Sequence, residues 1–109
     1  MSELNLVPED LVRVQTLLTV YAPDAEVWAY GSRVNGLGHA ASDLDLVLRN
    51  PSDLLQRQPH LEDIRAAFSE SNLPFLVDVL DWARIPEAFR QEISRQYVVL
   101  HTLDHLHVA

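Results

Sequence analysis

Hydrophobic residues recur every three or four positions in three stretches of the chain, which is the spacing of an amphipathic helix. The stretches cover residues 8–22, residues 61 to about 72 and residues 86–97, and Pro23 stops the first of them. Their repeating positions are Leu11, Val14, Leu17, Leu18 and Tyr21, then Leu61, Ile64, Ala67 and Phe68, then Phe89, Ile93 and Tyr97 in register with Ile85. The pattern therefore predicts three helices.

Three further stretches are typical of β-strands. Residues 26–30 are rich in β-formers, and residues 75–82 form an apolar run with an acidic residue in its middle. Over residues 43–49 every second residue is a leucine, so the leucines take one face of a strand while Asp43 and Asp45 take the other. Between these stretches, the small and polar residues of 33–42 predict a loop, and residues 50–60 predict a connection.

The predicted order is helix, strand, loop, strand, helix, strand, helix. This order predicts an α+β fold in which a small mixed β-sheet is flanked by helices, mainly on one face. At 109 residues the chain has room for one domain with one core. We place that core at about residues 8–100 and expect residues 101–109 to form a C-terminal tail.

Composition and charge exclude several classes of function. The chain has no cysteine, which excludes disulfides, thiolate zinc sites and a cysteine nucleophile. All eight of its basic residues are arginines, and its formal net charge of −8 disfavours general DNA binding and binding to anionic membranes. Because the first residues lack the basic segment and apolar run of a signal peptide, we expect a cytoplasmic protein.

Gly31-Ser32, directly after the first predicted strand, has two interpretations. Taken alone, the pair is most often a turn, in which glycine supplies unusual backbone angles and serine a local hydrogen bond. The functional interpretation is that glycine lets a phosphate approach the backbone, while the serine hydroxyl and nearby N–H groups bind its oxygens. Arg33 would add donors to the phosphate, and a surface salt bridge is its alternative role.

Asp43 and Asp45 point the same way from one strand, which holds two carboxylates close together. A solvated strand face is the common interpretation of such a pair. Like charges side by side disfavour folding, however, unless something positive lies between them. Oxygen-only ligands of this kind suit Mg²⁺, so the pair is also a candidate metal site.

Two acidic residues of the third predicted strand compete for a place beside this pair. Asp78 and Asp81 are three residues apart and face opposite sides of a strand, so only one of them can join Asp43 and Asp45. We prefer Asp78, because a carboxylate in mid-strand is costly to keep, whereas water reaches Asp81 near the strand end. Capping of a backbone group, or an ion pair with Arg49, is the alternative role for Asp78.

The combination is more specific than its parts. Residues 30–48 contain Gly-Ser, then ten residues, then Asp-x-Asp, and Asp78 follows as a later strand carboxylate. This arrangement resembles the nucleotidyltransferase superfamily of DNA polymerase β type. At this length the chain is similar to the minimal group of that superfamily, the antitoxins of HEPN/MNT toxin–antitoxin pairs. The resemblance spans about residues 11–100, without the separate substrate-binding domain of the larger polymerases and aminoglycoside nucleotidyltransferases.

The resemblance implies a role for each motif residue. Gly31 and Ser32 would hold the β- and γ-phosphates of ATP. Asp43 and Asp45 would bind two Mg²⁺ ions, and Asp78 would bind one of them and help to deprotonate the acceptor hydroxyl. Two neighbouring metal ions stabilise both the attacking oxygen and the leaving pyrophosphate.

The resemblance also implies an acceptor and a partner. Members of this group transfer AMP from ATP to a tyrosine of the HEPN ribonuclease toxin and so silence it, which implies a complex with the toxin. Two rivals stay open. One is a binding-only antitoxin that blocks the toxin physically, and the other is nucleotide transfer to a small molecule, for which a homodimer would have to close over the acceptor.

Other residues allow both a structural and a functional interpretation. His101, His105 and His107 are candidate ligands of a transition metal, although a frayed polar C-terminus is the more common state of such a tail. Trp28 and Trp82 are expected in the core rather than stacked on a base. A solvated helix face is the expected position of the last arginines, Arg84, Arg90 and Arg95.

Overall fold

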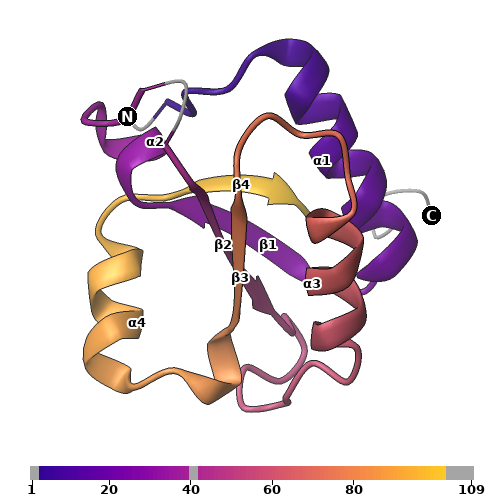
Figure 1. Ribbon diagram of the computed structural model, residues 1–109. Coiled ribbons are helices and arrows are strands. Elements are labelled where there is room, and N and C mark those ends of the chain that lie inside the picture. Colours follow the sequence, from indigo (N-terminus) through magenta and orange to yellow (C-terminus); the bar gives the residue numbers. More distant parts are fainter. Residues whose placement is uncertain (1–2, 40–41, 103–109) are drawn as a thin grey trace, which may run out of the picture.

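The computed structural model describes residues 3–39 and 42–102, which form one sheet with helices on both of its faces (Figure 1). The elements are α1 (Pro8–Tyr21), β1 (Glu26–Tyr30), α2 (Ser32–Asn35), β2 (Leu44–Arg49), α3 (Leu61–Ser69), β3 (Val77–Asp81), the 3-10 helix η1 (Trp82–Arg84), α4 (Glu87–Ser94) and β4 (Val98–His101). None of the helices in the described ranges is long and apolar enough to cross a membrane.

The sheet has the strand order β3-β2-β1-β4 and is mixed. Strand β1 pairs antiparallel with β2 and with β4, whereas β2 and β3 are parallel. The expected small mixed sheet flanked by helices is therefore confirmed. Since β1 ends where β2 and β3 begin, the residues at these three strand ends meet at one edge of the sheet.

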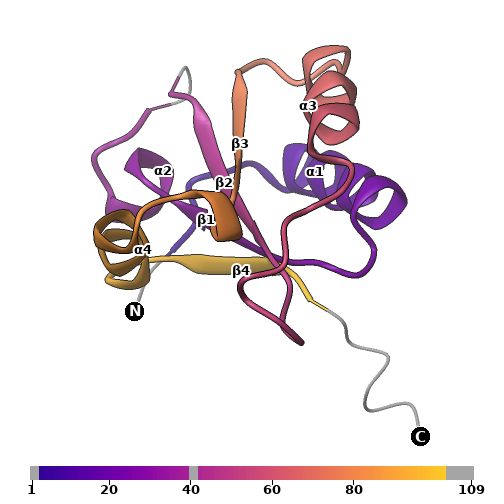
Figure 2. The same cartoon turned by 90° about the horizontal axis from the view of Figure 1, so that it is seen from below.

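The helices α1 and α3 cover one face of the sheet (Figure 2). The core on that face contains the three alternating leucines of β2, and each of these leucines is fully buried. The remaining larger members of this core are Val14, Leu18, Val27, Val34, Leu61, Ile64, Phe68, Val79 and Leu100. The periodicity of the helices and the alternation of β2 thus place most of the predicted residues in the core, with Tyr21 at the end of α1 as an exception that is exposed.

The opposite face is covered by η1 and α4, so the expectation of helices mainly on one face is incomplete. Its cluster consists of Trp28, Tyr30, Val47, Trp82 and Ile93. Strand β2 turns from polar at Asp45 to fully buried at Val47 along this face, which leaves a wet end and an apolar end. Both tryptophans are buried, as expected, and not exposed for stacking on a base.

Arg49 lies in this aromatic cluster and not beside Asp78. Its guanidinium stacks 3.9 Å from the ring centroid of Trp28 and 4.6 Å from that of Trp82, and it forms an ion pair with Glu26. The alternative ion pair of Asp78 with Arg49 is therefore wrong. Cation–π contact with two rings stabilises the charge of a guanidinium that is largely removed from water.

Three local predictions differ from the structure. The predicted loop over 33–42 begins with the short helix α2, α3 ends at Ser69, and α4 ends at Ser94. Tyr97 fits the periodicity of the last helix but lies beyond its end, where its ring stacks 3.7 Å from that of Trp28. Burial against the same aromatic cluster explains why Tyr97 continues the apolar pattern without being helical.

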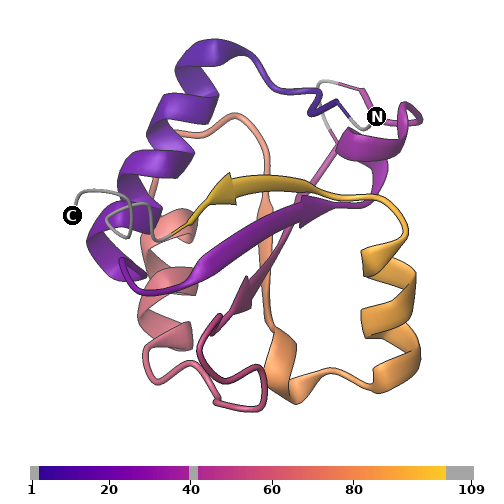
Figure 3. The same cartoon turned by 180° about the vertical axis from the view of Figure 1, so that it is seen from behind.

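Strand β4 was not predicted. It lies along β1 at the edge of the sheet (Figure 3), and it includes His101, which was assigned to the tail. Four residues are too few to show a period, and the strand is held by its pairing with β1. His105 and His107 lie outside the described residues.

Of the three arginines expected on a solvated helix face, Arg84 and Arg90 form hydrogen bonds with other parts of the protein. Arg84 donates to Asp81 over 2.9 Å, and Arg90 donates to the carbonyl of Trp82 over 2.9 Å. Arg95 matches the expectation, since it is exposed and pairs with Glu92 one turn away.

Asp81 is buried, contrary to the expectation that water reaches it at the strand end. Its carboxylate accepts hydrogen bonds from the backbone N–H of Gln58 (2.9 Å) and of Ala83 (3.1 Å) and from Arg84 (2.9 Å). These bonds join the connection after β2 to the start of η1. Asp81 therefore anchors the fold, whereas Asp78 is exposed.

We expect Asp81→Asn to lower the free energy of unfolding by about 2–4 kcal/mol, because two buried donors and a cation lose a charged acceptor. Urea unfolding followed by circular dichroism measures the change. Asp78→Asn is the matched control on the same strand and should not destabilise the protein. A difference between the two variants below about 0.5 kcal/mol would contradict the anchoring role of Asp81.

Candidate active site

Three acidic residues named from the sequence meet at the edge where β1 ends and β2 and β3 begin. Asp45 lies opposite Tyr30 in the antiparallel pair and opposite Asp78 in the parallel pair. Asp43 directly precedes β2 and lines the same cavity as Asp78. The structure thus places Asp78, and not Asp81, on the side of Asp45, as expected. The reason given for preferring Asp78 is wrong, because Asp78 is the exposed carboxylate and Asp81 the buried one.

The electrostatics show that these carboxylates act on one another. Burial, and after it the charges of Asp78 and Asp43, together raise the pKa of Asp45 from its ordinary 3.8 to about 6. Burial also raises the pKa of Tyr30 above its ordinary range, with added contributions from Asp45 and Asp78. Negative charge is thus concentrated in this part of the molecule, which is an arrangement that attracts positive charge.

The Gly-Ser turn lies against the same carboxylates. Gly31 has a φ of +80°, which L side chains rarely adopt, and a Cβ on it would come within 2.3 Å of the Asp45 carboxylate oxygen. Glycine is therefore required here both by the backbone angle and by the close approach of Asp45. The Ser32 side chain is half-buried, and its hydroxyl makes no hydrogen bond within the described part of the chain.

The loop after α2 folds back onto this turn. The N–H of Gly38 donates to the carbonyl of Ser32 over 2.9 Å, and a Cβ on Gly38 would lie 2.7 Å from that same oxygen. Gly38 was not singled out from the sequence. A glycine seven residues after Gly31 is a weak signal, because only the folded loop brings it against Ser32.

Arg33 lies inside the fold and is not displayed at the surface. It is 3% exposed, and its guanidinium donates to the carbonyls of Ser42 (2.8 Å) and Asn5 (2.7 Å) and lies 4.2 Å from the ring centroid of Phe75. Its burial follows from its place on the inner side of α2. Arg33 thus holds the N-terminal segment, the loop before β2 and the segment before β3 around the turn.

A preformed metal cage is not part of this arrangement. Among residues 3–39 and 42–102, no three histidine or acidic side chains are grouped closely enough to hold a metal ion by themselves. Mg²⁺ usually binds through one or two carboxylates and completes its shell with waters and substrate phosphates. The carboxylates are therefore suited to hold a cation together with a phosphate-bearing substrate rather than alone.

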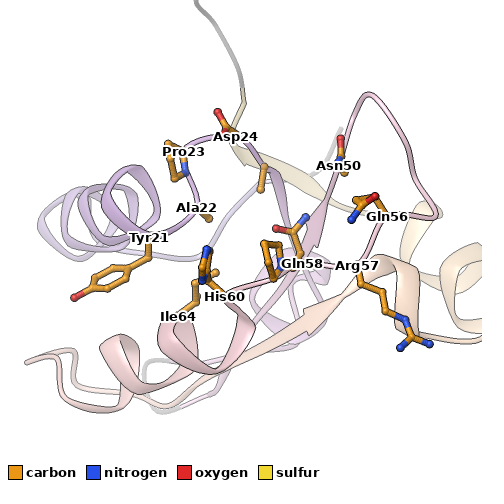
Figure 4. A pocket seen from close by; sticks show the side chains of 12 residues that line it. Tyr21, Ala22, Pro23, Asp24, Asn50, Gln56, Arg57, Gln58, His60 and Ile64 are labelled. Carbon is orange, nitrogen blue, oxygen red and sulfur yellow. The ribbon is translucent and has the colours of Figure 1, made fainter.

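A separate cavity of about 340 Å³ lies at the other end of the sheet (Figure 4). It is bounded by the end of α1 and by the connection after β2, and its labelled side chains include Tyr21, Asn50, Gln58 and His60. No residue of the Gly-Ser or Asp-x-Asp motifs lines it. The chemistry of the molecule is therefore concentrated at the opposite edge.

Tyr30 was placed in a strand from the sequence but not in the site. Its place opposite Asp45 requires the antiparallel register of β1 and β2, which the spacing of the two segments does not reveal. The ring packs edge-on against Phe89, at 5.8 Å between centroids, so α4 forms a wall behind the carboxylates.

Known proteins are similar to this chain over most of its length. The family described as "Poly(A) RNA polymerase, mitochondrial-like, central palm domain" matches residues 6–93. A Haemophilus influenzae protein named "Probable protein adenylyltransferase MntA" is 45% identical over 101 residues, which are 91% of this chain and 85% of that protein. A solved structure described as "Crystal structure of the toxin-antitoxin with AMP-PNP" matches with a TM-score of 0.67 at 19% identity, over 91% of this chain and 77% of that one, and so has the same fold.

We expect Asp45→Asn to be more stable than the wild type at pH 7.5. In the folded protein Asp45 keeps its proton up to about pH 6, whereas in the unfolded chain it loses the proton near its ordinary pKa of 3.8. The free energy of unfolding therefore falls as the pH rises from about 4 to 6, and Asn at this position avoids that loss. Because the carboxylate is half-buried, solvent screening reduces the gain to about 1 kcal/mol. Urea unfolding of both proteins from pH 4 to 8 measures the difference. A difference that does not shrink toward pH 4 would contradict the assignment to Asp45.

Proposed function

Because the chain belongs to the minimal nucleotidyltransferases of the DNA polymerase β superfamily, we propose that it transfers AMP from ATP to a hydroxyl of a partner protein. The observation that carries the proposal is the convergence of Asp43, Asp45 and Asp78 beside the turn at Gly31 and Ser32. The name of the H. influenzae relative supports AMP as the transferred group and a protein as the acceptor.

The donor set of the site fits Mg²⁺. Asp43, Asp45 and Asp78 offer only carboxylate oxygens, and the pKa of Asp45 is raised by burial and by the negative charges of the other two. These three residues would hold two Mg²⁺ ions, with phosphate oxygens of ATP completing the coordination. When bound, the ions would neutralise the charge of the phosphates and of the attacking oxygen.

The residues of the site act at different points of the proposed reaction. The acceptor oxygen attacks the α-phosphorus of ATP, the bond from that phosphorus to the pyrophosphate oxygen breaks, and the hydroxyl proton passes to Asp78. The products are the AMP ester of the acceptor and pyrophosphate. Gly31 would let the β- and γ-phosphates approach the backbone, and the Ser32 hydroxyl, which has no partner in the described chain, would donate to them.

We further propose that the acceptor is a tyrosine of a cognate HEPN ribonuclease toxin, which the modification would silence. A tyrosine hydroxyl with a pKa of about 10 needs help to ionise at neutral pH, and exposed Asp78 is accessible to a second protein. The toxin–antitoxin complex with the same fold supports a toxin as partner. The net charge of −8 is complementary to the basic face expected of an RNA-binding protein.

The alternatives differ in what they require of the carboxylates. A binding-only antitoxin needs a docking surface but no cluster of three acidic side chains, and the repulsion between their charges would then destabilise the protein without a use. Transfer to a small molecule would need a second domain or a second subunit to close over the acceptor. A protein acceptor would not need such a domain, because its own surface would cover the reacting groups.

We expect the partner protein encoded beside this chain to gain the mass of one or more AMP units after incubation with the chain, ATP and Mg²⁺. Asp43→Asn, Asp45→Asn and Asp78→Asn should each abolish the gain, because each removes a charge from the reacting site. Intact-mass spectrometry measures it.

Asp24→Asn is the matched control, since Asp24 is exposed in the turn before β1 and far from the site. Asp81→Asn should retain transfer in its folded fraction. A stable complex without any mass gain, equal for the wild type and the variants, would favour the binding-only antitoxin.

We expect Gly31→Ala to lower kcat by about 100-fold, because its methyl group would displace the Asp45 carboxylate. Gly36→Ala controls for backbone strain. Gly36 has a similar φ of +82° but no atom within 4 Å of a Cβ, so it should keep most of the activity. Gly36→Ala should lose roughly 1–2 kcal/mol of stability from its left-handed backbone, and Gly31→Ala should lose more, because its φ of +80° with a ψ of −155° is a conformation that essentially only glycine adopts. Steady-state kinetics and thermal unfolding separate the two effects, and equal losses of kcat would contradict the role of Gly31.

A further inference from the structure

A cavity of about 410 Å³ opens beside the carboxylates, between the segment that leads from α3 into β3 and the start of β2. We refer to it as the α3–β3 pocket. Its lining includes Asp43, Leu73, Phe75, Leu76, Val77 and Asp78. Two carboxylates of the candidate site thus line a pocket together with five apolar residues, while Arg65, Ser69 and Ser71 complete its lining.

The position of this pocket relative to the Gly-Ser turn is set by the strand order. The turn follows β1, Asp45 lies on β2, and the pocket lies at β3, so the turn and the pocket are on opposite sides of Asp45. In an in-line displacement at phosphorus, the attacking oxygen enters on the side opposite the leaving pyrophosphate. With the β- and γ-phosphates at Gly31 and Ser32, the pocket is on the side from which the acceptor must come.

The chemistry of the lining selects the kind of acceptor. Arg65 is the only cation in the lining, and its guanidinium is already bonded to the carbonyl of Val79 (3.0 Å) and to Glu62 (2.7 Å). A polyanionic acceptor such as an RNA end would therefore face two carboxylates and a single guanidinium that is already paired with Glu62. Apolar walls that end at carboxylates fit an aromatic side chain whose hydroxyl points toward Asp43 and Asp78.

Leu76 is the residue of this pocket that a partner would meet first. It is 74% exposed, although the hydrogen bond from the N–H of Leu44 to its carbonyl fixes its backbone next to the site. Because side chains alternate along an extended segment, Leu76 and Asp78 are on the same face. Phe75 beside it is held by the buried guanidinium of Arg33, so the rim is attached to the Gly-Ser turn.

We propose that the α3–β3 pocket receives the aromatic side chain that bears the acceptor hydroxyl, and that Leu76 determines specificity by contacting an apolar residue beside it. The inference rests on the proposed AMP transfer. The size supports one occupant of this kind, since about 300–1,000 Å³ is typical of a pocket that encloses a small ligand.

Steady-state kinetics of Leu76→Glu tests the proposal, with Leu55→Glu as the matched control. Both leucines are 74% exposed, but Leu55 lies in the connection after β2 and does not line the pocket. At saturating ATP, Leu76→Glu should raise the KM for the partner protein by about tenfold or more, because a charge replaces an apolar contact. The KM for ATP should stay within about twofold of the wild type, and Leu76→Met should restore acceptor KM.

Three results would overturn the assignment, and they are distinct from one another. A raised KM for ATP with an unchanged KM for the partner would show that the pocket holds the nucleotide, and kinetics equal to those of Leu55→Glu would show that it holds neither substrate. In both cases the AMP transfer would stand. Absence of transfer by the wild-type chain would instead contradict the proposed function, and the pocket assignment with it.

Discussion

Three carboxylates stay close together in this protein because β2 is held in the middle of the sheet. Its leucines, Leu44, Leu46 and Leu48, are fully buried, and each such side chain contributes about 1.5–3 kcal/mol of hydrophobic stabilisation. That burial, together with pairing to β1 and β3 on either side, offsets the repulsion that raises the pKa of Asp45. The fold thus supplies the free energy that keeps an acidic site assembled, and a bound cation would relieve the remaining repulsion.

The second constraint is the packing around the Gly-Ser turn. Gly31 leaves just enough room for the Asp45 carboxylate, and Gly38 closes the following loop onto Ser32. Arg33 holds the surrounding segments through two backbone carbonyls and the Phe75 ring. The same buried guanidinium therefore supports both the proposed phosphate end of the site and the rim of the α3–β3 pocket. An arginine that sequence motifs assign to the substrate serves here to position the groups on either side of it.

One face of the sheet mainly stabilises the fold, and the other contains the candidate site. Helices α1 and α3 bury the leucine face completely, whereas the other face is apolar only where η1 and α4 cover it. At its open end Tyr30, Asp45 and Asp78 form one row across three strands. Asp81, on the opposite side of β3, is used for backbone hydrogen bonds instead. Strand β3 thus carries one aspartate of the candidate site, Asp78, and one structural aspartate, Asp81. The two lie on opposite sides because side chains alternate along the strand.

The amino-acid sequence alone determines the three long helices, three of the strands and the candidate carboxylates, because these depend on periodicity and on short motifs within each segment. It also shows that only one of Asp78 and Asp81 can face Asp45, since faces alternate along a strand, whereas the parallel register of β2 and β3 decides that this one is Asp78. Only the tertiary structure decides that β4 pairs with β1, that Arg33 is buried, that Tyr30 faces Asp45 and that Leu76 borders a pocket. Each of these depends on contacts between segments far apart in the chain, for which a local pattern contains no signal.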